Sequence, residues 1–312
     1  MEKGIADYLV GDSFTGFMLV KSSIQATARN GKPYLNVTIG DATGEVTSMI
    51  WDADENKVSV FTSGNIIAVQ GVVGDYQGKK QLNIQQFRVS KDEDNIDLST
   101  LLETAPIEGE ALFKVIKLEV LDMTNEKLKE ITLTILNKYK KDFELFPAAK
   151  SVHHSYVSGL AFHTFSMMSI AKEMCKLYPV LNKDLLIAGV IIHDIGKIKE
   201  YSGYVATEVT LEGRLKGHIS IMNEEIGSIA KELDIDGEEV LLLQHMVLSH
   251  HGKGEWGSPV APMLIEANVL HQIDMMDASL DAYKNAVKDT DKEKFTERIF
   301  GLDNRSFYNP TI

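Results

Sequence analysis

Apolar and polar residues alternate over most of the first 90 positions, which predicts β-strands. The Asn30-Gly31 pair is a hairpin signal, and the GDATG run at 40–44 predicts a second turn. Residues 52–61 suit a short helix between the third and fourth strands. This order of elements predicts a small Greek-key barrel of five strands. Its strand patterns cover residues 15–26, 34–39, 45–51, 66–73 and 81–89.

From about residue 108 the apolar positions recur every three to four residues, which predicts helices. These helical patterns cover residues 109–121, 125–142, 158–178, 183–193, 218–233, 237–250 and 261–288. Residues 92–107 are acidic and contain a proline near their end, which predicts a linker. We therefore expect an α+β chain of several domains, with a β-barrel domain at 1–91, a linker at 92–107 and an all-α domain at 108–312.

The composition is that of an ordinary globular chain with two domains. A chain of 312 residues, 44% of them hydrophobic, can bury a core without disulfides. The single cysteine, Cys175, excludes an intramolecular disulfide and fits a reducing compartment. Since no run of about 18 apolar residues is present, we expect no membrane span. The N-terminus lacks the layout of a secretory signal, so we expect a cytoplasmic protein.

The net charge of −13 argues mildly against a nucleic-acid partner, but the charge is unevenly distributed. Residues 1–91 carry nine Lys/Arg and nine Asp/Glu, so the excess acid lies downstream. Carboxylates that bind a metal ion are included in this count, although the ion would offset them. The overall charge is therefore weak evidence about the substrate.

Histidine and aspartate interrupt the most apolar helical stretches. Seven of the nine histidines lie between positions 163 and 271, and His193-Asp194 directly follow the apolar run 185–192. A helix this apolar is buried on nearly all sides. A single buried histidine is more often a core residue than a ligand. An imidazole beside a carboxylate, however, is costly to bury unless the two are paired or bound to a metal ion.

These motifs resemble the HD-domain phosphohydrolase superfamily, whose pattern is a His, then a His-Asp pair, then a distant Asp. In this chain the pattern falls on His163 in GLAFHTFSM, on His193-Asp194 in HDIGK and on Asp274 in IDMMDA. The match covers about residues 150–285, the expected core of the HD domain. It implies a metal-dependent phosphohydrolase in which His163, His193 and Asp274 hold one ion.

Further histidines suggest a second ion. In binuclear members of the superfamily the HD aspartate bridges two ions, and by that resemblance Asp194 would bridge here. His218, His250 and His251 would then complete the second site. His250-His251 also suit a solvated helix C-terminus, where a charged imidazole is favourable. One ion and two ions both stay open.

The ligand types narrow the choice of metal. Mixed imidazole and carboxylate ligands suit Mn²⁺, Fe²⁺, Co²⁺ or Zn²⁺ better than Ca²⁺ or Mg²⁺ alone. Three or four protein ligands leave positions for a water and a phosphate oxygen. A metal ion there lowers the pKa of its water and neutralises charge on the transition state.

Basic residues near the ligands are candidates for binding the phosphate. Lys197 follows the His-Asp pair by one turn, and Arg214 and Lys216 precede His218. Each of these cations has an ordinary alternative as a solvated side chain. The candidate catalytic residues are Asp194, Lys197 and His218.

The remaining histidines have less certain roles. His153 and His154 precede the first ligand helix, and either line the pocket as proton donors or cap an interface. We count His154 among the candidate substrate-binding residues. His245 and His271 we expect in the core or behind the ligands.

The run YLNVTIGDATGEVTSMIWD (34–52) resembles the second and third strands of OB-fold nucleic-acid-binding domains, so we expect a barrel of the OB type. Such a barrel binds single strands in a groove with aromatic stacking positions. Five residues on or beside turns are candidate contacts: Tyr34, Tyr76, Lys32, Lys79 and Lys80. Phe17 and Trp51 are also candidate contacts, but we expect them in the barrel core.

An OB domain before an HD domain, together with the runs GRLKGHI and VLSHHGKGEWGSP, resembles the YhaM-type 3′→5′ exoribonucleases. The resemblance implies Mn²⁺-dependent removal of nucleotides from the 3′ end of single-stranded RNA, with single-stranded DNA as an alternative substrate. The absence of net charge on the barrel of this chain differs from what we expect of a nucleic-acid-binding domain. Binding by counterion release needs several Lys/Arg contacts. We infer modest affinity, raised where the protein forms a homo-oligomer.

Two other functions stay open. The histidine set also resembles cyclic-dinucleotide or nucleotide phosphohydrolases, although GKGEWGSP follows His251 where that branch has a GYP signature. A nucleic-acid-binding regulatory protein with a vestigial HD domain is the third reading. The intact ligand set argues against it, since an inactive domain has no reason to keep buried charges.

Overall fold

The computed structural model describes residues 3–76, 78–149, 154–205, 207–288 and 290–312. Contacts divide the chain into two compact units, Met1–Thr104 and Ala105–Ile312. Each unit has a hydrophobic core of its own. Within the described residues, no helix is long and apolar enough to cross a membrane.

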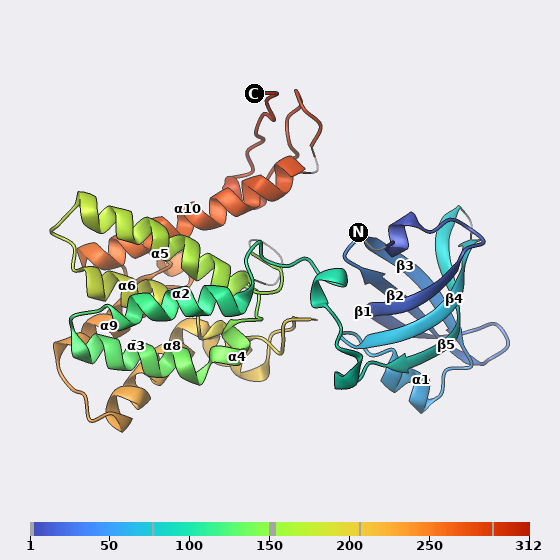
Figure 1. Ribbon diagram of the computed structural model, residues 1–312, viewed down its shortest axis with the longest axis horizontal. Helices are drawn as coiled ribbons and strands as arrows, with labels where there is room; N and C mark the ends of the chain where they lie inside the picture. Colours follow the sequence, from blue (N-terminus) through green and yellow to red (C-terminus); the bar gives the residue numbers. More distant parts are fainter. Residues whose placement is uncertain (1–2, 77, 150–153, 206, 289) are drawn as a thin grey trace. The chain divides into compact units, whose positions relative to one another are not determined.

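The first unit is a closed five-stranded barrel (Figure 1). Its strands are β1 (Ser13–Thr27), β2 (Pro33–Asp41), β3 (Gly44–Trp51), β4 (Ile66–Tyr76) and β5 (Lys79–Val89). The strands follow the order β1-β2-β3-β5-β4, and a parallel pairing of Thr47 with Gln81 closes the barrel. Helix α1 (Glu55–Val60) lies between β3 and β4 in the chain. The predicted OB-type barrel is confirmed.

Alternation along the strands fills the barrel. On β2, Leu35, Val37 and Ile39 are buried and point to the same face. Phe61, directly after α1, is fully buried and packs against Phe87 with 4.9 Å between ring centroids. One end of α1 is thereby anchored in the barrel core. Three 3₁₀ turns complete this unit: Ile5–Asp7, Asp92–Asp94 and Leu98–Thr100.

The second unit is helical, and its elements match the predicted helices closely. They are α2 (Gly109–Leu121), α3 (Glu126–Lys138), α4 (Lys140–Phe143), α5 (Gly159–Leu177), α6 (Lys183–Ile192), α7 (Lys197–Glu200), α8 (Leu211–Glu232), α9 (Glu238–Ser249) and α10 (Ile265–Lys288), with 3₁₀ turns at Gly254–Trp256 and Phe300–Leu302. Three features differ from the prediction. The pattern at 125–142 is divided between α3 and α4. The short helix α7 was not expected, and α8 begins at Leu211 instead of residue 218.

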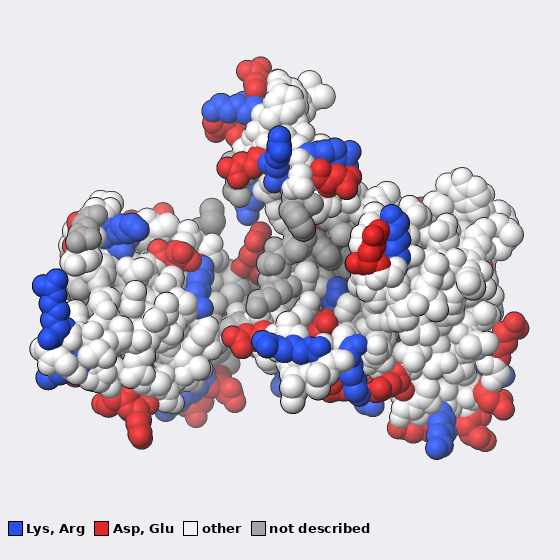
Figure 2. Space-filling model, turned by 180° about the vertical axis from the view of Figure 1, so that it is seen from behind, with Lys and Arg blue, Asp and Glu red and all other residues white. Residues whose placement is uncertain are grey.

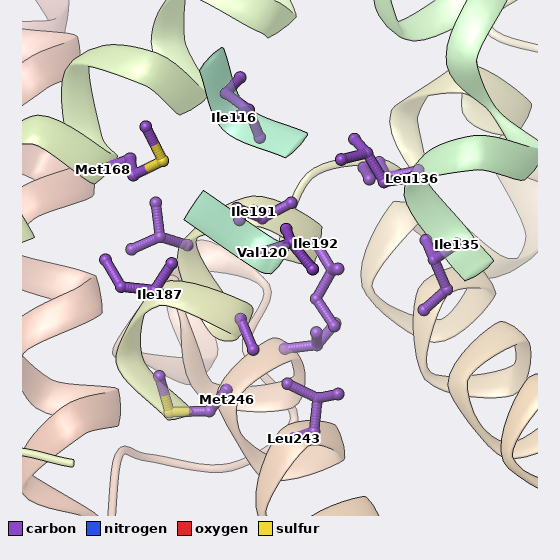
Figure 3. Packing of buried hydrophobic residues seen from close by; sticks show 14 of the residues in the cluster. Ile116, Val120, Ile135, Leu136, Met168, Ile187, Ile191, Ile192, Leu243 and Met246 are labelled. Atoms are coloured by element: carbon purple, nitrogen blue, oxygen red, sulfur yellow. The ribbon is translucent and has the colours of Figure 1, made fainter. Parts of the chain in front are cut away.

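Helix α6 lies at the centre of the helical unit. All nine residues from Asp184 to Ile192 are buried, and α6 packs against α3, α5, α9 and α10. Figure 3 shows Ile187, Ile191 and Ile192 surrounded by apolar side chains of the neighbouring helices. The residues that follow α6 are therefore placed in the interior of the domain.

Two glycines bring α8 close to the end of α6. A Cβ on Gly196 would lie 2.3 Å from the carbonyl oxygen of His218, so only glycine allows this approach. Gly217 has a φ of 69° and interrupts the helical geometry of α8 just before His218. This kink explains why the pattern in the sequence predicted only the second part of the helix.

We expect the two cores to respond separately to cavity-forming mutations. Ile187→Ala in α6 should destabilise the helical unit by about 2–5 kcal/mol, because it removes a buried side chain from a close-packed core. Ile39→Ala should have a similar effect on the barrel alone. Differential scanning calorimetry with domain-specific fluorescence checks this. A single transition that shifts equally in both variants would contradict the prediction.

Candidate metal centre and nucleic-acid groove

The centre is built around Asp194, the residue after the C-cap of α6. Asp194 and His193 are 3% and 0% exposed. The Asp194 Oδ2 atom lies 3.4 Å from Nε2 of His193 and 3.8 Å from Nε2 of His163. The other oxygen, Oδ1, lies 3.5 Å from Nε2 of His218 and 3.7 Å from Nε2 of His250. The two carboxylate oxygens thus face two different sets of imidazoles.

The candidate ligand atoms form groups that are compact enough for each group to bind one ion. The groups that lie within 4.8 Å include His163 with His193 and Asp274, and His218 with His250 and His251. Two donors that bind one ion at about 2.1 Å lie roughly 3 to 3.5 Å apart. The side chains that the sequence singled out on α5, α6, α8, α9 and α10 are therefore brought together by the fold.

Each of these imidazoles is oriented through Nδ1. His193 and His250 donate Nδ1–H to the carbonyls of Val190 and Val247, three residues earlier. His251 donates to the carbonyl of Trp256 at 2.7 Å. A proton held on Nδ1 leaves the lone pair on Nε2, which is the atom that a metal needs.

Two carboxylates behind the ligands complete this orientation. Glu200 on α7 lies 2.9 Å from Nδ1 of His218, and Asp277 lies 2.7 Å from Nδ1 of His163. Neither Asp277 nor Glu200 was among the site residues predicted from the sequence. Carboxylate–histidine pairs of this kind fix the ring and raise its basicity as a ligand.

Burial and charge set the protonation of the centre. Burial alone would raise the pKa of Asp194, but the charges of Lys197 and His193 hold it well below its usual value. Burial, with the nearby His193 and His251, also holds the pKa of His250 well below its usual value. Burial would lower the pKa of His163, yet hydrogen bonds to Asp274 and Asp277 raise it to about 9. The carboxylates of the centre therefore favour a positive charge beside them.

This donor set fits a divalent metal ion. In the described part of the chain, Oδ1 of Asp194 and Nε2 of His218 and His250 are buried without a hydrogen-bond partner. Buried acceptors in this state are costly, and a cation among them would satisfy all three. Together with the mixed imidazole and carboxylate chemistry, this is a buried His/Asp cluster of the kind that binds divalent metals.

A pocket of about 240 Å³ opens beside the centre. Lys197 is 7% exposed, and its ammonium lies 2.6 Å from Oδ2 of Asp194. It is therefore a buried partner of the centre and not a solvated helix end. The lining residues are Lys197, His251, Trp256, His271, Asp274, Met275 and Ala278.

The structure does not favour the other predicted phosphate contacts. His154 is 2% exposed, and its ring nitrogens bind Tyr156 and Asp277, so it lies behind His163 and not in the pocket. His153 lies outside the described residues. Arg214 and Lys216 are exposed on α8, and the described lining of the pocket does not include them. Lys216 is instead paired with Glu212 and Glu224.

The two histidines expected in the core or behind the ligands have separate positions. His245 is half-buried and accepts a hydrogen bond from the backbone of Met263. His271 is buried, donates to the carbonyl of His250 and lines the pocket. His271 therefore supports the loop that carries a ligand and also forms part of the pocket wall.

A second groove, of about 510 Å³, lies on the outer face of the barrel. Trp51, Tyr76 and Lys79 line it together with the polar side chains of Asn36, Thr47, Gln81 and Asn83 and with Met49. The Trp51 ring packs against Tyr34, with 5.2 Å between centroids. Trp51 is 56% exposed, so its expected place in the core is wrong. Val46 and Ile50 face inward, which turns Thr47, Met49 and Trp51 outward.

The other barrel predictions have mixed outcomes. Phe17 is only half-buried and lies near Arg88, at the surface of a shallow groove. Lys80 donates to the carbonyls of Ile5 and Ala6, so it holds the N-terminal turn and is not free for a phosphate. Lys32 is exposed but paired with Asp52. Figure 2 shows the barrel at the left, where the Lys and Arg side chains are scattered and are accompanied by Asp and Glu side chains.

Comparisons with known proteins agree with both halves. Residues 160–279 match the HD domain family, and residues 18–90 match the OB-fold nucleic acid binding domain family. Over all 312 residues the chain is 50% identical to 3′-5′ exoribonuclease YhaM of Listeria innocua and of Listeria monocytogenes, and it covers 100% of each relative. It is 46% identical to the same enzyme of Oceanobacillus iheyensis, of which it covers 98%.

Identity at this level over the full length of both chains, with the two domains in the same order, establishes the family. The buried His/Asp cluster of the second domain is consistent with a hydrolase of this kind. The chain belongs to the YhaM family of 3′-5′ exoribonucleases, and is built from an OB-fold domain followed by an HD domain.

Proposed function

We propose that this protein is a metal-dependent 3′→5′ exoribonuclease that acts on single-stranded RNA at the centre around Asp194. The observation that carries the proposal is the Asp194 carboxylate, whose oxygens face separate groups of imidazoles. A bridging carboxylate between two ions has this arrangement. We assign one ion to His163, His193 and Asp274, and the other to His218, His250 and His251, with Asp194 shared.

We propose Mn²⁺ as the metal, with Co²⁺, Fe²⁺ or Zn²⁺ as alternatives that the same ligands accept. When bound, a metal pair activates a water and neutralises charge on the phosphate under attack. The protein holds the centre in place. Glu200 and Asp277 fix the rings of His218 and His163, and the buried Lys197 restrains Asp194.

Lys197 has a second role in this proposal. Its ammonium is buried against Asp194 and also lines the pocket, beside the place where a phosphate would lie. A buried cation at that position stabilises the additional negative charge of the transition state more strongly than it would in water. We therefore propose Asp194, Lys197 and His218 as the catalytic residues.

The residues of the barrel groove are suited to binding a single-stranded substrate. Trp51 and Tyr76 offer exposed aromatic faces on which unpaired bases stack, and the nearby Asn and Gln side chains offer hydrogen bonds. Lys79 adds one cation. These contacts suit RNA and DNA alike, so single-stranded DNA is a second proposed ligand. An RNA substrate and the single cysteine, Cys175, fit a cytoplasmic location, which we also propose. Assembly into a homo-oligomer stays a prediction.

Asp194→Ala should lower exonuclease activity by about a thousandfold or more, because it removes the ligand shared by both groups. Metal content should fall, whereas binding of RNA to the barrel should be unchanged. Inductively coupled plasma mass spectrometry and cleavage of 5′-labelled single-stranded RNA with Mn²⁺ measure the two effects. Asp122→Ala, at a residue with 73% of its side chain exposed, is the control. Normal cleavage by Asp194→Ala would refute the assignment.

Glu200→Ala should weaken metal affinity roughly 10- to 100-fold, because the His218 ring loses the carboxylate that orients it. Activity should recover when the metal concentration is raised. Titration of activity against Mn²⁺ measures the shift. Glu224→Ala, at an exposed residue of α8, is the matched control. An unchanged Mn²⁺ requirement in the Glu200 variant would exclude the role given to Glu200.

Trp51→Ala should weaken binding of long single-stranded RNA roughly tenfold, the expected loss for one stacking position. Cleavage of short oligonucleotides should be nearly unaffected, since their reaction depends on the metal centre. Fluorescence anisotropy and steady-state kinetics measure these two effects. Ile24→Ala, a change at a 63%-exposed residue of β1, is the control. Equal RNA affinities of the Trp51 and Ile24 variants would refute the proposed binding of RNA in the groove.

A further inference from the structure

The pocket at the metal centre is lined by two sets of residues of different chemistry, which we call its polar and apolar walls. Lys197, Asp274 and His251 form a polar wall that belongs to the centre itself. Trp256, with Met275, forms an aromatic and apolar wall that the proposed chemistry leaves unused. A nucleotide has the same division, since its phosphate is anionic and its base has apolar faces. The pocket is therefore polar where a phosphate would bind and apolar beside it.

Trp256 contacts His271 and Lys253 but keeps an accessible surface. It ends the 3₁₀ turn Gly254–Trp256, and its side chain is 45% exposed. The Trp256 and His271 rings lie 6.0 Å apart at an angle of 38°. The ammonium of Lys253 lies 4.4 Å from the indole centroid, but the Lys253 side chain is itself 57% exposed and can move aside. Large exposed aromatic rings beside a reactive centre are typical of ligand contacts.

A hydrogen bond couples the backbone of Trp256 to the metal centre. The carbonyl of Trp256 accepts from Nδ1 of His251, so the turn that carries the ring also orients one of the proposed ligands. The backbone that carries the ring is thereby held beside the centre. A group that packs on the indole would be positioned accurately relative to a phosphate on the polar wall.

We infer that Trp256 packs against the base of the 3′-terminal nucleotide while the scissile phosphate lies at the polar wall. This inference rests on the proposed exonuclease function. The pocket, at about 240 Å³, lies below the roughly 300–1,000 Å³ of most ligand pockets. It suits one nucleotide and not a run of several. Stacking on an indole accepts every base, so the terminal nucleotide is held without sequence selection.

The test compares RNA substrates that differ only in one base. One has an abasic residue at the 3′ terminus, and another has it at the penultimate position. The wild-type enzyme should lose roughly tenfold to a hundredfold in kcat/KM when the terminal base is removed. The penultimate abasic substrate should be cleaved in its first step at nearly the normal rate. An equal loss at both positions would overturn the inference.

Trp256→Ala should lose a similar factor on normal RNA, with no further loss when the terminal base is absent. Trp256→Phe should keep most of the discrimination, because a ring remains. Phe295→Ala, at a residue that is 67% exposed near the C-terminus, is the control. The His251 hydrogen bond uses a backbone carbonyl and is retained in each Trp256 variant. If Trp256→Ala nevertheless loses metal, Trp256→Leu, which keeps an apolar side chain without an aromatic ring, replaces it in the comparison.

The role of Trp256 and the exonuclease function can be refuted separately. If Trp256→Ala discriminates against the abasic terminus as strongly as the wild type, the inference is overturned, although the exonuclease function stands. If the wild-type protein with Mn²⁺ does not shorten RNA from its 3′ end, the proposed function itself fails, and the inference fails with it.

Discussion

The helical domain depends on one constraint, the burial of the Asp194 carboxylate among imidazoles at the end of an apolar helix. Four ring nitrogens lie within 3.4 to 3.8 Å of its oxygens. Lys197 bonds only one of the two carboxylate oxygens, Oδ2, and Oδ1 has no hydrogen-bond partner among the described residues. Burying a carboxylate with unpaired acceptors is costly unless a cation completes it. The neighbouring helices can be understood as the supports of that arrangement.

Close contacts between neighbouring segments hold the carboxylate and its imidazoles in place. Gly196 lets the backbone of His218 approach the segment after α6, and the break at Gly217 turns that histidine inward. Helix α7, only four residues long, carries both Lys197 and Glu200, one on each side of the centre. Glu225 on α8 binds Lys199 of the same short helix. A displacement of α7 would therefore disturb the shared carboxylate and His218 together.

The sequence predicted the fold well, because period-2 and period-3.6 patterns reflect burial directly. His193 and Asp194 were predictable as site residues because they interrupt an apolar helix. Glu200 was not, since a glutamate on a short, partly polar helix is usually solvated and its contact with His218 depends on tertiary packing. His154 was misplaced for the same reason, because only the fold shows that it lies behind His163.

The error at Trp51 was avoidable. Strand parity already places Trp51 on the face opposite Val46 and Ile50, but an aromatic residue at a strand end was assigned by its hydrophobicity alone.

The exposed Trp51 and Tyr76 also resolve the apparent conflict between a neutral barrel and a nucleic-acid substrate. Binding by counterion release requires several cations. Lys79 is the one cationic residue among the described residues that line the groove. Stacking requires aromatic faces instead, and contributes per base without net charge. In the role that we propose for it, the groove would hold single strands with moderate affinity and weak salt dependence. An exonuclease benefits from such binding, because the strand must advance after every cleavage and a tightly held backbone would oppose that movement.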